Sequence, residues 1–127
     1  MEKEFKGKRI LVTGGTGSIG SAIVKEILKY KPKQVRVFSR DETKQFELSH
    51  ELDPKAPVNF LIGDIRDKER LNMAMENIDI VFHAAAYKHV PLMEEHPDET
   101  VKNNIFGTKI LTDISLNCGA EKFIFIS

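Results

Sequence analysis

The alternation of two kinds of segment constrains the fold of this 127-residue chain more than any other feature. Short apolar runs rich in β-branched residues are separated by stretches in which apolar residues recur at helical spacing. Runs of the first kind are typical of buried strands. They span residues 10–12, 35–38, 58–62, 80–82 and 123–126. Strands that alternate with helices pair in parallel through right-handed crossovers, so we expect a doubly wound α/β domain with helices on both faces of the sheet.

Helices are expected between these strands. Their apolar residues repeat within residues 19–27, 71–75 and 101–118. Asp41 and Asp67 precede the second and third helices and are suited to cap them, because a carboxylate accepts hydrogen bonds from the free N–H groups of a helix start. The chain ends one residue after the fifth strand. We therefore expect residues 1–127 to form a single domain that is part of a longer protein.

Composition excludes several classes of function. Lys plus Arg and Asp plus Glu each number 19, so no overall positive charge exists to hold nucleic acid. The one cysteine cannot form an internal disulfide, which favours a reducing, cytoplasmic setting. No apolar run approaches the roughly 20 residues of a membrane-spanning helix. We expect a cytoplasmic protein with no nucleic-acid partner and no membrane segment in this chain.

A glycine-rich turn joins the first strand to the first helix. Its sequence, Thr-Gly-Gly-Thr-Gly-Ser-Ile-Gly, contains G-x-G-x-x-G and also the wider pattern T-G-x-x-G-x-x-G. Glycines in this place permit a tight turn and a close approach of the backbone to a pyrophosphate, which the positive helix N-terminus attracts. The turn therefore predicts dinucleotide binding. The predicted binding residues are Thr13, Gly14, Gly15, Thr16, Gly17, Ser18, Ile19 and Gly20.

The end of the second strand indicates which dinucleotide is bound. An acidic side chain about twenty residues after the glycines would receive the ribose 2′-hydroxyl of NAD. Here Ser39 and Arg40 hold that place, and Lys44 follows one helical turn later. Arginine pairs with phosphate through charge-assisted hydrogen bonds, which favours NADP. The alternative is NAD, with Asp41 turned toward the ribose and Arg40 solvated.

Two further strand ends supply candidate cofactor residues. Asp64 and Ile65 follow the third strand, where the carboxylate can accept from the adenine amino group and Ile65 can flank the ring. The alternative is that Asp64 is only a turn residue after a glycine. The fourth strand ends in small residues that would let a dinucleotide lie close to the backbone. These are Ala84, Ala85 and Ala86.

Three longer segments resemble a known family. They are Phe-Ser-Arg-Asp-Glu-Thr-Lys-Gln at residues 38–45, Ala-Ala-Ala-Tyr-Lys-His-Val-Pro-Leu-Met-Glu at 84–94, and Val-Lys-Asn-Asn-Ile-Phe-Gly-Thr at 101–108. With the glycine turn, they resemble the extended short-chain dehydrogenase/reductases, and within them the CapD-like polysaccharide-biosynthesis branch. The resemblance implies a Rossmann domain in a homo-oligomeric nucleotide-sugar 4,6-dehydratase, typically acting on UDP-N-acetylglucosamine. Related members are UDP-sugar 4-epimerases.

The resemblance also implies a reaction and shows what the chain lacks for it. Bound NADP would take hydride from C4 of the hexose and return it at C6 after water is lost across C5 and C6. The family's acid/base residues lie in a Ser-Thr-Asp-Lys segment and in a later Tyr-x-x-x-Lys or Met-x-x-x-Lys motif. Ser127 matches only the first residue of the Ser-Thr-Asp-Lys segment. Neither tyrosine is followed by a lysine four residues on. We expect no catalytic residue within the chain, and hence cofactor binding without turnover. A non-catalytic dinucleotide-binding module is the alternative.

The resemblance places three more residues near the cofactor. Lys88, Asn104 and Ser127 are expected to lie close to it. Lys88 and His89 follow the fourth strand, near where the nicotinamide ribose and the sugar should meet, and either could position substrate; the alternative is that both are solvated loop residues. The alternative for Asn104 is a helix residue bonded to backbone. A metal site is not expected, because the histidines lack the spacing of a ligand set. The histidines considered are His50, His83, His89 and His96. Cys118 is expected in the core rather than as a nucleophile.

Overall fold

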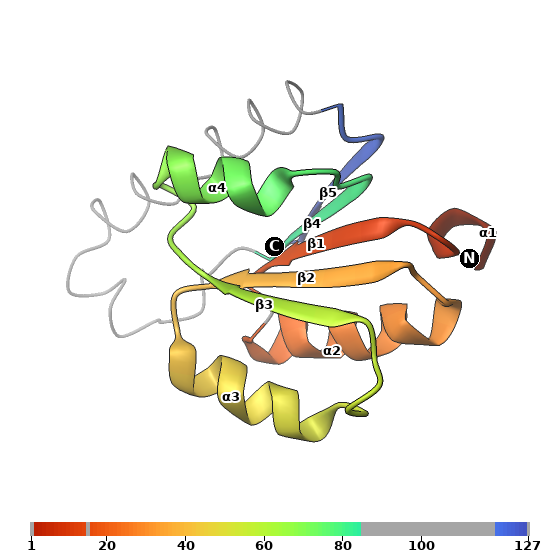
Figure 1. The fold of residues 1–127 in the computed structure, drawn as a ribbon, viewed down its shortest axis with the longest axis horizontal. Coiled ribbons are helices and arrows are strands. Elements are labelled where there is room, and N and C mark those ends of the chain that lie inside the picture. The colour runs from red at the N-terminus through yellow and green to blue at the C-terminus, as the bar shows by residue number, and fades with distance from the viewer. Residues whose placement is uncertain (1, 15, 85–118, 127) are drawn as a thin grey trace.

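The computed structural model describes residues 2–14, 16–84 and 119–126, which form one parallel sheet (Figure 1). Its strand order is β3-β2-β1-β4-β5, and every neighbouring pair is parallel. The strands are β1 (Arg9–Thr13), β2 (Gln34–Ser39), β3 (Val58–Ile62), β4 (Ile80–Ala84) and β5 (Lys122–Ile126). All five predicted strands are confirmed. The order reverses between β1 and β4, and in open α/β sheets ligands bind at the carboxyl ends of the strands beside such a switch point.

Helices cover both faces of the sheet, as the alternation predicts (Figure 1). The helices α2 (Ser18–Ile27) and α3 (Glu42–Glu51) lie on one face, and α4 (Lys68–Met75) lies on the other. The 3₁₀ turn η1 (Leu28–Tyr30) continues α2. A short helix that the sequence did not predict, α1 (Glu2–Phe5), precedes β1. The helix expected over residues 101–118 lies outside the described residues. The domain has the doubly wound α/β fold.

The predicted N-caps are confirmed at both helices where they were expected. Asp41 accepts a hydrogen bond from the Lys44 N–H at 3.0 Å, and Asp67 accepts one from the Arg70 N–H at 3.2 Å. Both caps have extended backbone dihedrals, as a residue just outside a helix requires. The starts of α3 and α4 are therefore fixed by their own sequence.

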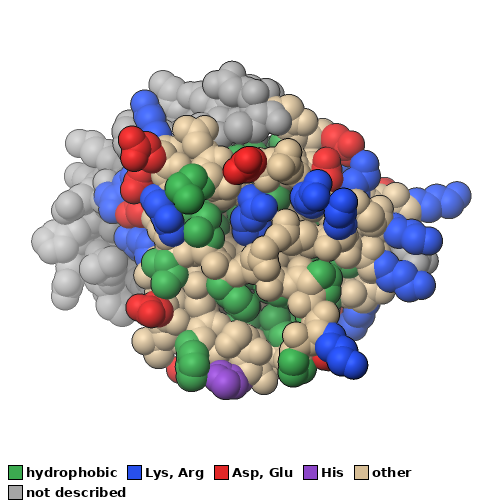
Figure 2. All heavy atoms as spheres, viewed as in Figure 1, with side chains coloured by type: hydrophobic (Ala, Val, Ile, Leu, Met, Phe, Trp, Pro, Cys, Tyr) green, Lys and Arg blue, Asp and Glu red, His purple; other side chains and the backbone are tan. Residues whose placement is uncertain are grey.

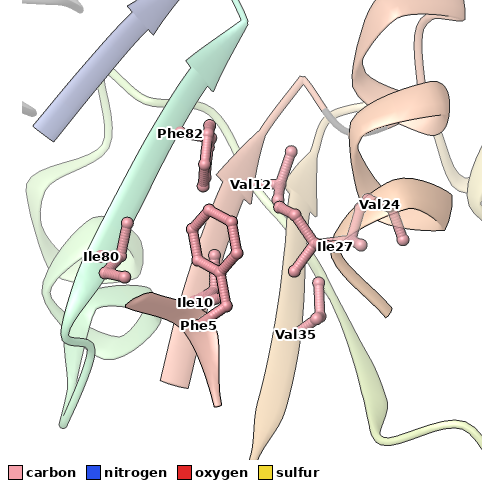
Figure 3. Close-up of a cluster of buried hydrophobic side chains, with 9 residues drawn as sticks. Phe5, Ile10, Val12, Val24, Ile27, Val35, Ile80 and Phe82 are labelled. Atoms are coloured by element: carbon pink, nitrogen blue, oxygen red, sulfur yellow. The ribbon is translucent and has the colours of Figure 1, made fainter. Parts of the chain in front are cut away.

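Each face of the sheet has its own apolar core. Figure 3 shows the cluster on the α2 side, in which the Phe5 ring of α1 lies among side chains of β1, β2, β4 and α2. The cluster on the α4 side includes Leu11, Leu71 and Met75. Successive residues of β1 enter opposite clusters, because side chains alternate along a strand. Burial of one such side chain contributes roughly 1.5–3 kcal/mol, so apolar packing holds both helical layers on the sheet.

The end of α4 is held by a residue of β2. Arg36 Nη1 donates to the carbonyl oxygens of Ala74 at 2.6 Å and Glu76 at 3.1 Å, and more distantly to that of Met73. The last turn of α4 has no basic residue of its own, so Arg36 supplies the positive charge that favours a helix C-terminus. Burial lowers the pKa of the Arg36 guanidinium.

Charged side chains of both signs are spread over the face seen in Figure 2, with hydrophobic side chains between them. Within the described ranges, no helix is long and apolar enough to cross a membrane.

Candidate functional site

The glycine turn begins where β1 ends, and its first glycine is fixed by geometry. Gly14 has a φ of +70°, and its N–H donates to the Phe38 carbonyl at 2.9 Å. A Cβ at Gly14 would lie 2.6 Å from the backbone oxygen of Ala84, closer than real Cβ atoms come to backbone. The turn therefore passes directly against the end of β4. Only glycine meets both demands without strain.

The third glycine of the turn, Gly17, is the N-cap of α2 and has a different environment. Among the described residues, a Cβ there would meet only the Gly14 oxygen, at an ordinary 3.6 Å. Gly17 is exposed, provides no side-chain cap, and no acidic residue lies in the first turn of α2. Packing within the described part of the chain thus gives no reason for glycine here. An open, uncapped helix start without a side chain is suited to bind phosphate through backbone N–H groups.

The other described residues of the turn lie around this helix start. Thr16 and Ile19 are half-buried, Ser18 is exposed, and Gly20 is buried within α2. Gly15 lies outside the described residues. The structure therefore brings the predicted phosphate-binding residues to the switch point of the sheet, where a dinucleotide is expected.

Beneath the turn, Thr13 of β1 and His83 of β4 form a buried pair. The Thr13 hydroxyl is hydrogen-bonded to His83 Nδ1 at 2.5 Å, and the two residues are 1% and 3% exposed. Burial lowers the pKa of His83 to about 4, so the ring is neutral at physiological pH. The Thr13 side chain is thus engaged inside the fold, and the cofactor contact of Thr13 stays a prediction. Sequence analysis considered His83 only as a metal ligand and missed this pairing.

No cluster of three or more potential metal ligands occurs among the described residues. Of the four histidines, His50 and His83 belong to that part of the chain. His89 and His96 lie outside the described residues, as does Cys118.

At the end of β2, Ser39 turns into the fold. It is buried, and its hydroxyl accepts a hydrogen bond at 3.0 Å from the amide of Gln45, which also donates to the Leu61 carbonyl at 3.0 Å. The predicted contact of Ser39 with a ribose is therefore left to the small exposed part of this residue. Gln45 ties α3 to β2 and β3, a role that sequence analysis missed because it depends on the register of these strands.

Arg40 and Lys44, in contrast, extend toward solvent. The Arg40 side chain is 71% exposed, and Lys44 in the first turn of α3 is also exposed. The carboxylate of Asp41 caps α3, so this acid has a structural task of its own. Arg40 and Lys44 thus present positive charge to solvent at this strand end, while Asp41 is engaged at the start of α3.

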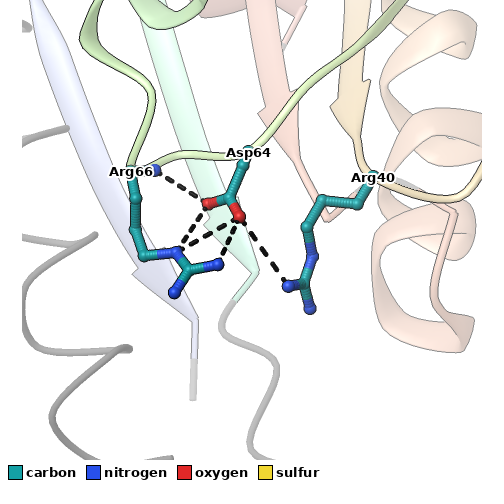
Figure 4. Close-up of polar contacts among 3 residues, drawn as sticks. All are labelled: Arg40, Asp64 and Arg66. Carbon is teal, nitrogen blue, oxygen red and sulfur yellow. Dashed lines mark hydrogen bonds and ion pairs between the residues drawn. The ribbon is translucent and has the colours of Figure 1, made fainter.

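Asp64, after β3, lies between two guanidinium groups (Figure 4). Arg66 Nη2 donates to its Oδ2 at 2.7 Å, Arg66 Nε donates to its Oδ1 at 3.1 Å, and the Arg66 backbone N–H donates to Oδ1 at 2.9 Å. Arg40 makes a single longer ion pair with Oδ2 at 3.8 Å. The side-chain hydrogen bond from Arg66 is the main cause that lowers the pKa of Asp64. The turn contact foreseen as the alternative for Asp64 is therefore present, and the adenine contact stays a prediction.

Close packing also shapes the end of β3. A Cβ at Gly63 would lie 2.7 Å from the ring of Phe38 in β2, and the Gly63 N–H donates to the Ser39 carbonyl at 2.9 Å.

Of the remaining predicted cofactor residues, Ile65 packs against the α4-side core, and Ala84 ends β4 half-buried. Five other predicted residues lie outside the described ranges. These are Ala85, Ala86, Lys88, Asn104 and Ser127.

A cavity of about 440 Å³ lies elsewhere, against β3 and the end of α4. Its lining includes Arg36, Asn59, Met73 and Glu76, and none of the predicted cofactor residues. The candidate site is therefore the strand-end region around the glycine turn, Arg40 and Asp64, and this cavity is separate from it.

Known sequences are similar to this chain over almost its whole length. An uncharacterised membrane protein of Methanocaldococcus jannaschii is 54% identical over 123 residues, which is 97% of this chain and 37% of that protein. A UDP-N-acetylglucosamine 4,6-dehydratase (inverting) of Campylobacter jejuni is 48% identical over 124 residues, again 97% of this chain and 37% of the relative. The chain thus spans about a third of the length of these relatives.

Solved structures share the fold. The protein Pen from Bacillus thuringiensis superposes with a TM-score of 0.88 at 48% identity, over 95% of this chain and 37% of Pen. A dTDP-glucose 4,6-dehydratase from Streptomyces venezuelae, solved with NAD bound, gives 0.78 at 26% identity, over 91% of this chain and 38% of that enzyme. The model of the polysaccharide biosynthesis protein family matches residues 10–127. With its glycine turn at the switch point of a Rossmann sheet, the chain belongs to this polysaccharide biosynthesis family.

Proposed function

We propose that this chain binds NADP and is the cofactor-binding part of a nucleotide-sugar 4,6-dehydratase of the UDP-N-acetylglucosamine type. One observation carries the cofactor part: the start of α2, where the exposed N-cap Gly17 brings no side chain, lies beside a turn that Gly14 fixes against β4. Such a helix start binds phosphate without help from side chains. The NAD named with the Streptomyces dehydratase supports a nicotinamide dinucleotide as the ligand class.

The preference for NADP rests on the end of β2. Arg40 is exposed there, Lys44 lies on the next helical turn, and Asp41 is used as a helix cap. A guanidinium beside an ammonium favours a ribose that carries a 2′-phosphate, whereas NAD sites use a free carboxylate at this place. NAD is the alternative cofactor.

The dehydratase assignment rests on the relatives, since the chain itself holds only the cofactor residues. The Campylobacter enzyme supports a UDP-sugar as the substrate of the whole protein. A UDP-glucose 4-epimerase of Rickettsia prowazekii is 38% identical over 127 residues, which keeps epimerisation as the second candidate at lower similarity. A bound nicotinamide supplies a hydride acceptor and donor, and the protein must add an acid/base pair at the sugar.

Residues 1–127 lack that pair, so we expect the chain alone to bind cofactor and to leave UDP-N-acetylglucosamine unchanged. Formation of the 4-keto-6-deoxy sugar by the purified chain would contradict this expectation. A homo-oligomeric, cytoplasmic whole protein stays a prediction.

Calorimetric titration with NADP and with NAD at matched salt tests the cofactor proposal. We expect Arg40→Ala to weaken NADP by about tenfold or more, the effect of one charge-assisted hydrogen bond, and NAD by less than about twofold. Lys55→Ala is the control, because this lysine is exposed in the loop that precedes β3, at the opposite end of that strand. Equal losses for NADP and NAD in Arg40→Ala would contradict the phosphate contact. Binding of neither nucleotide to the parent chain would contradict the site.

A further inference from the structure

Two guanidinium groups compete for the carboxylate of Asp64, and they are held unequally (Figure 4). Arg66 binds both oxygens through Nε and Nη2, with distances between 2.7 and 3.2 Å. Arg40 approaches only Oδ2, at 3.8 Å. Bidentate, charge-assisted hydrogen bonds are much stronger than a single ion pair at that distance near solvent. Arg66 therefore takes most of the hydrogen-bonding capacity of Asp64.

The exposure of the three side chains fits this difference. Arg40 is 71% exposed, Arg66 40% and Asp64 28%. Arg66 is fixed beside the turn, whereas most of the Arg40 side chain faces solvent at the end of β2. Arg40 therefore lies within reach of Asp64, but most of its hydrogen-bonding groups are not engaged by this carboxylate.

The consequence is clearest when Arg66 is taken away. The Asp64 carboxylate would then lack its bidentate partner, and Arg40 would be the nearest guanidinium able to replace it. A close pair between Arg40 and Asp64 would neutralise Arg40. An anion that depends on Arg40 would then compete with the Asp64 carboxylate for the same guanidinium.

We propose that Arg66 is a specificity-determining residue of the nucleotide site: by occupying the Asp64 carboxylate it keeps Arg40 available to the 2′-phosphate of a dinucleotide. Arg66 is thus a positioning residue that acts through Asp64. This inference rests on the proposed NADP function. It concerns only the phosphorylated ribose, so it predicts a selective loss of NADP over NAD.

Calorimetric titration of the chain with NADP and NAD at low ionic strength tests this role. The variant Arg66→Gln keeps the backbone N–H that donates to Asp64, so the turn retains one of its bonds. We expect about a fivefold loss of NADP affinity with less than about a twofold change for NAD, the upper range for a partly exposed charge pair. Arg66→Lys, which keeps the charge, should recover part of the loss.

Arg70→Gln is the matched control for loss of positive charge. Arg70 lies near the same strand end, but its Nε and Nη2 donate to the Ile62 carbonyl and not to Asp64. We expect at most about a twofold loss, because Arg70 acts on the phosphate only through its field, which solvent and salt screen. A loss in Arg70→Gln as large and as selective as that in Arg66→Gln would show a general field effect and overturn the proposal.

A double-mutant cycle separates action through Asp64 from direct contact with the ligand. In an Asp64→Asn background, Arg66→Gln should change NADP affinity no more than Arg70→Gln does. An undiminished selective loss would mean that Arg66 binds the phosphate itself, and the proposal would be wrong.

The same experiments separate this inference from the proposed function. If Arg40→Ala is selective for NADP and Arg66→Gln is not, the inference fails and the proposed function stands. If Arg40→Ala weakens NADP and NAD equally, the phosphate contact is wrong and the inference falls with it.

Discussion

Two strand-end regions of the candidate site are built on different physics. Where β1 and β4 end, Gly14 lies against the Ala84 carbonyl and the Thr13–His83 pair is buried. Where β2 and β3 end, Arg40, Asp64 and Arg66 meet near solvent. The first region is held by close packing and buried hydrogen bonds, which salt hardly affects. The second is held by charges that salt screens. Under the proposed function, the first region positions the dinucleotide and the second selects NADP over NAD.

The largest expected effect is at Gly14. Gly14→Ala puts a Cβ 2.6 Å from the Ala84 oxygen in a backbone with φ of +70°, so we expect the free energy of unfolding to fall by about 2–4 kcal/mol. Urea unfolding measures it. Gly7→Ala is the matched control, with a φ of +72° and nothing within 4 Å of its Cβ. If both variants lose the same stability, the close approach to β4 has no energetic weight.

The second effect is a pH dependence that comes from His83. Because its pKa is lowered to about 4 in the folded chain, the unfolded chain takes up a proton near pH 6.5 that the folded chain refuses. The contribution of His83 to the free energy of unfolding should be constant above pH 6.5 and fall by up to about 3 kcal/mol as the pH falls from 6.5 to 4. Urea unfolding at a series of pH values measures this slope. An unchanged slope in His83→Gln would assign the loss to other groups.

Thr13→Val tests the same region without a change of charge. The substitution keeps the shape of the side chain and removes the hydroxyl that is bonded to His83 Nδ1, so we expect a loss of about 1–3 kcal/mol in unfolding free energy. Thr13→Ser retains the hydroxyl and should lose less. The comparison of the two regions would break if Thr13→Val were as stable as the parent chain.

The smallest effect on stability is expected at the end of β2. Arg40→Ala removes a mostly exposed side chain whose ion pair is 3.8 Å long, so we expect a change below about 0.5 kcal/mol in unfolding free energy. The same variant should lower NADP affinity strongly. A large loss of stability in Arg40→Ala would contradict this division, because the region at the ends of β2 and β3 would then also stabilise the fold.

The parts of the molecule that could be predicted from sequence are those fixed by local or periodic signals. The five strands follow from apolar runs, and the caps Asp41 and Asp67 act within three residues of themselves. The glycine turn was also evident from spacing, although the sequence did not distinguish Gly14, which packing against β4 requires, from Gly17, where packing within the described residues leaves room for a Cβ.

Pairings between distant residues could not be predicted in the same way. Thr13 meets His83 because β1 and β4 are paired in one particular register, and a shift by one residue would separate them. The bonds from Gln45 to Ser39 and Leu61 likewise need three elements to be in place. The bond between Asp64 and Arg66 spans only two residues, so a closer look at that turn would have found it.

The bond from Arg36 to the end of α4 has a consequence for how the chain folds. An isolated helix of fewer than about 12–15 residues is marginal in water, and α4 has eight. Its last carbonyl groups accept hydrogen bonds from Arg36 of β2, which precedes Ala74 by 38 positions in the sequence. The final turn of α4 therefore gains its stability only when β2 is already in the sheet. We expect α4 and the sheet to fold as one cooperative unit, without an intermediate in which α4 is formed and β2 is not.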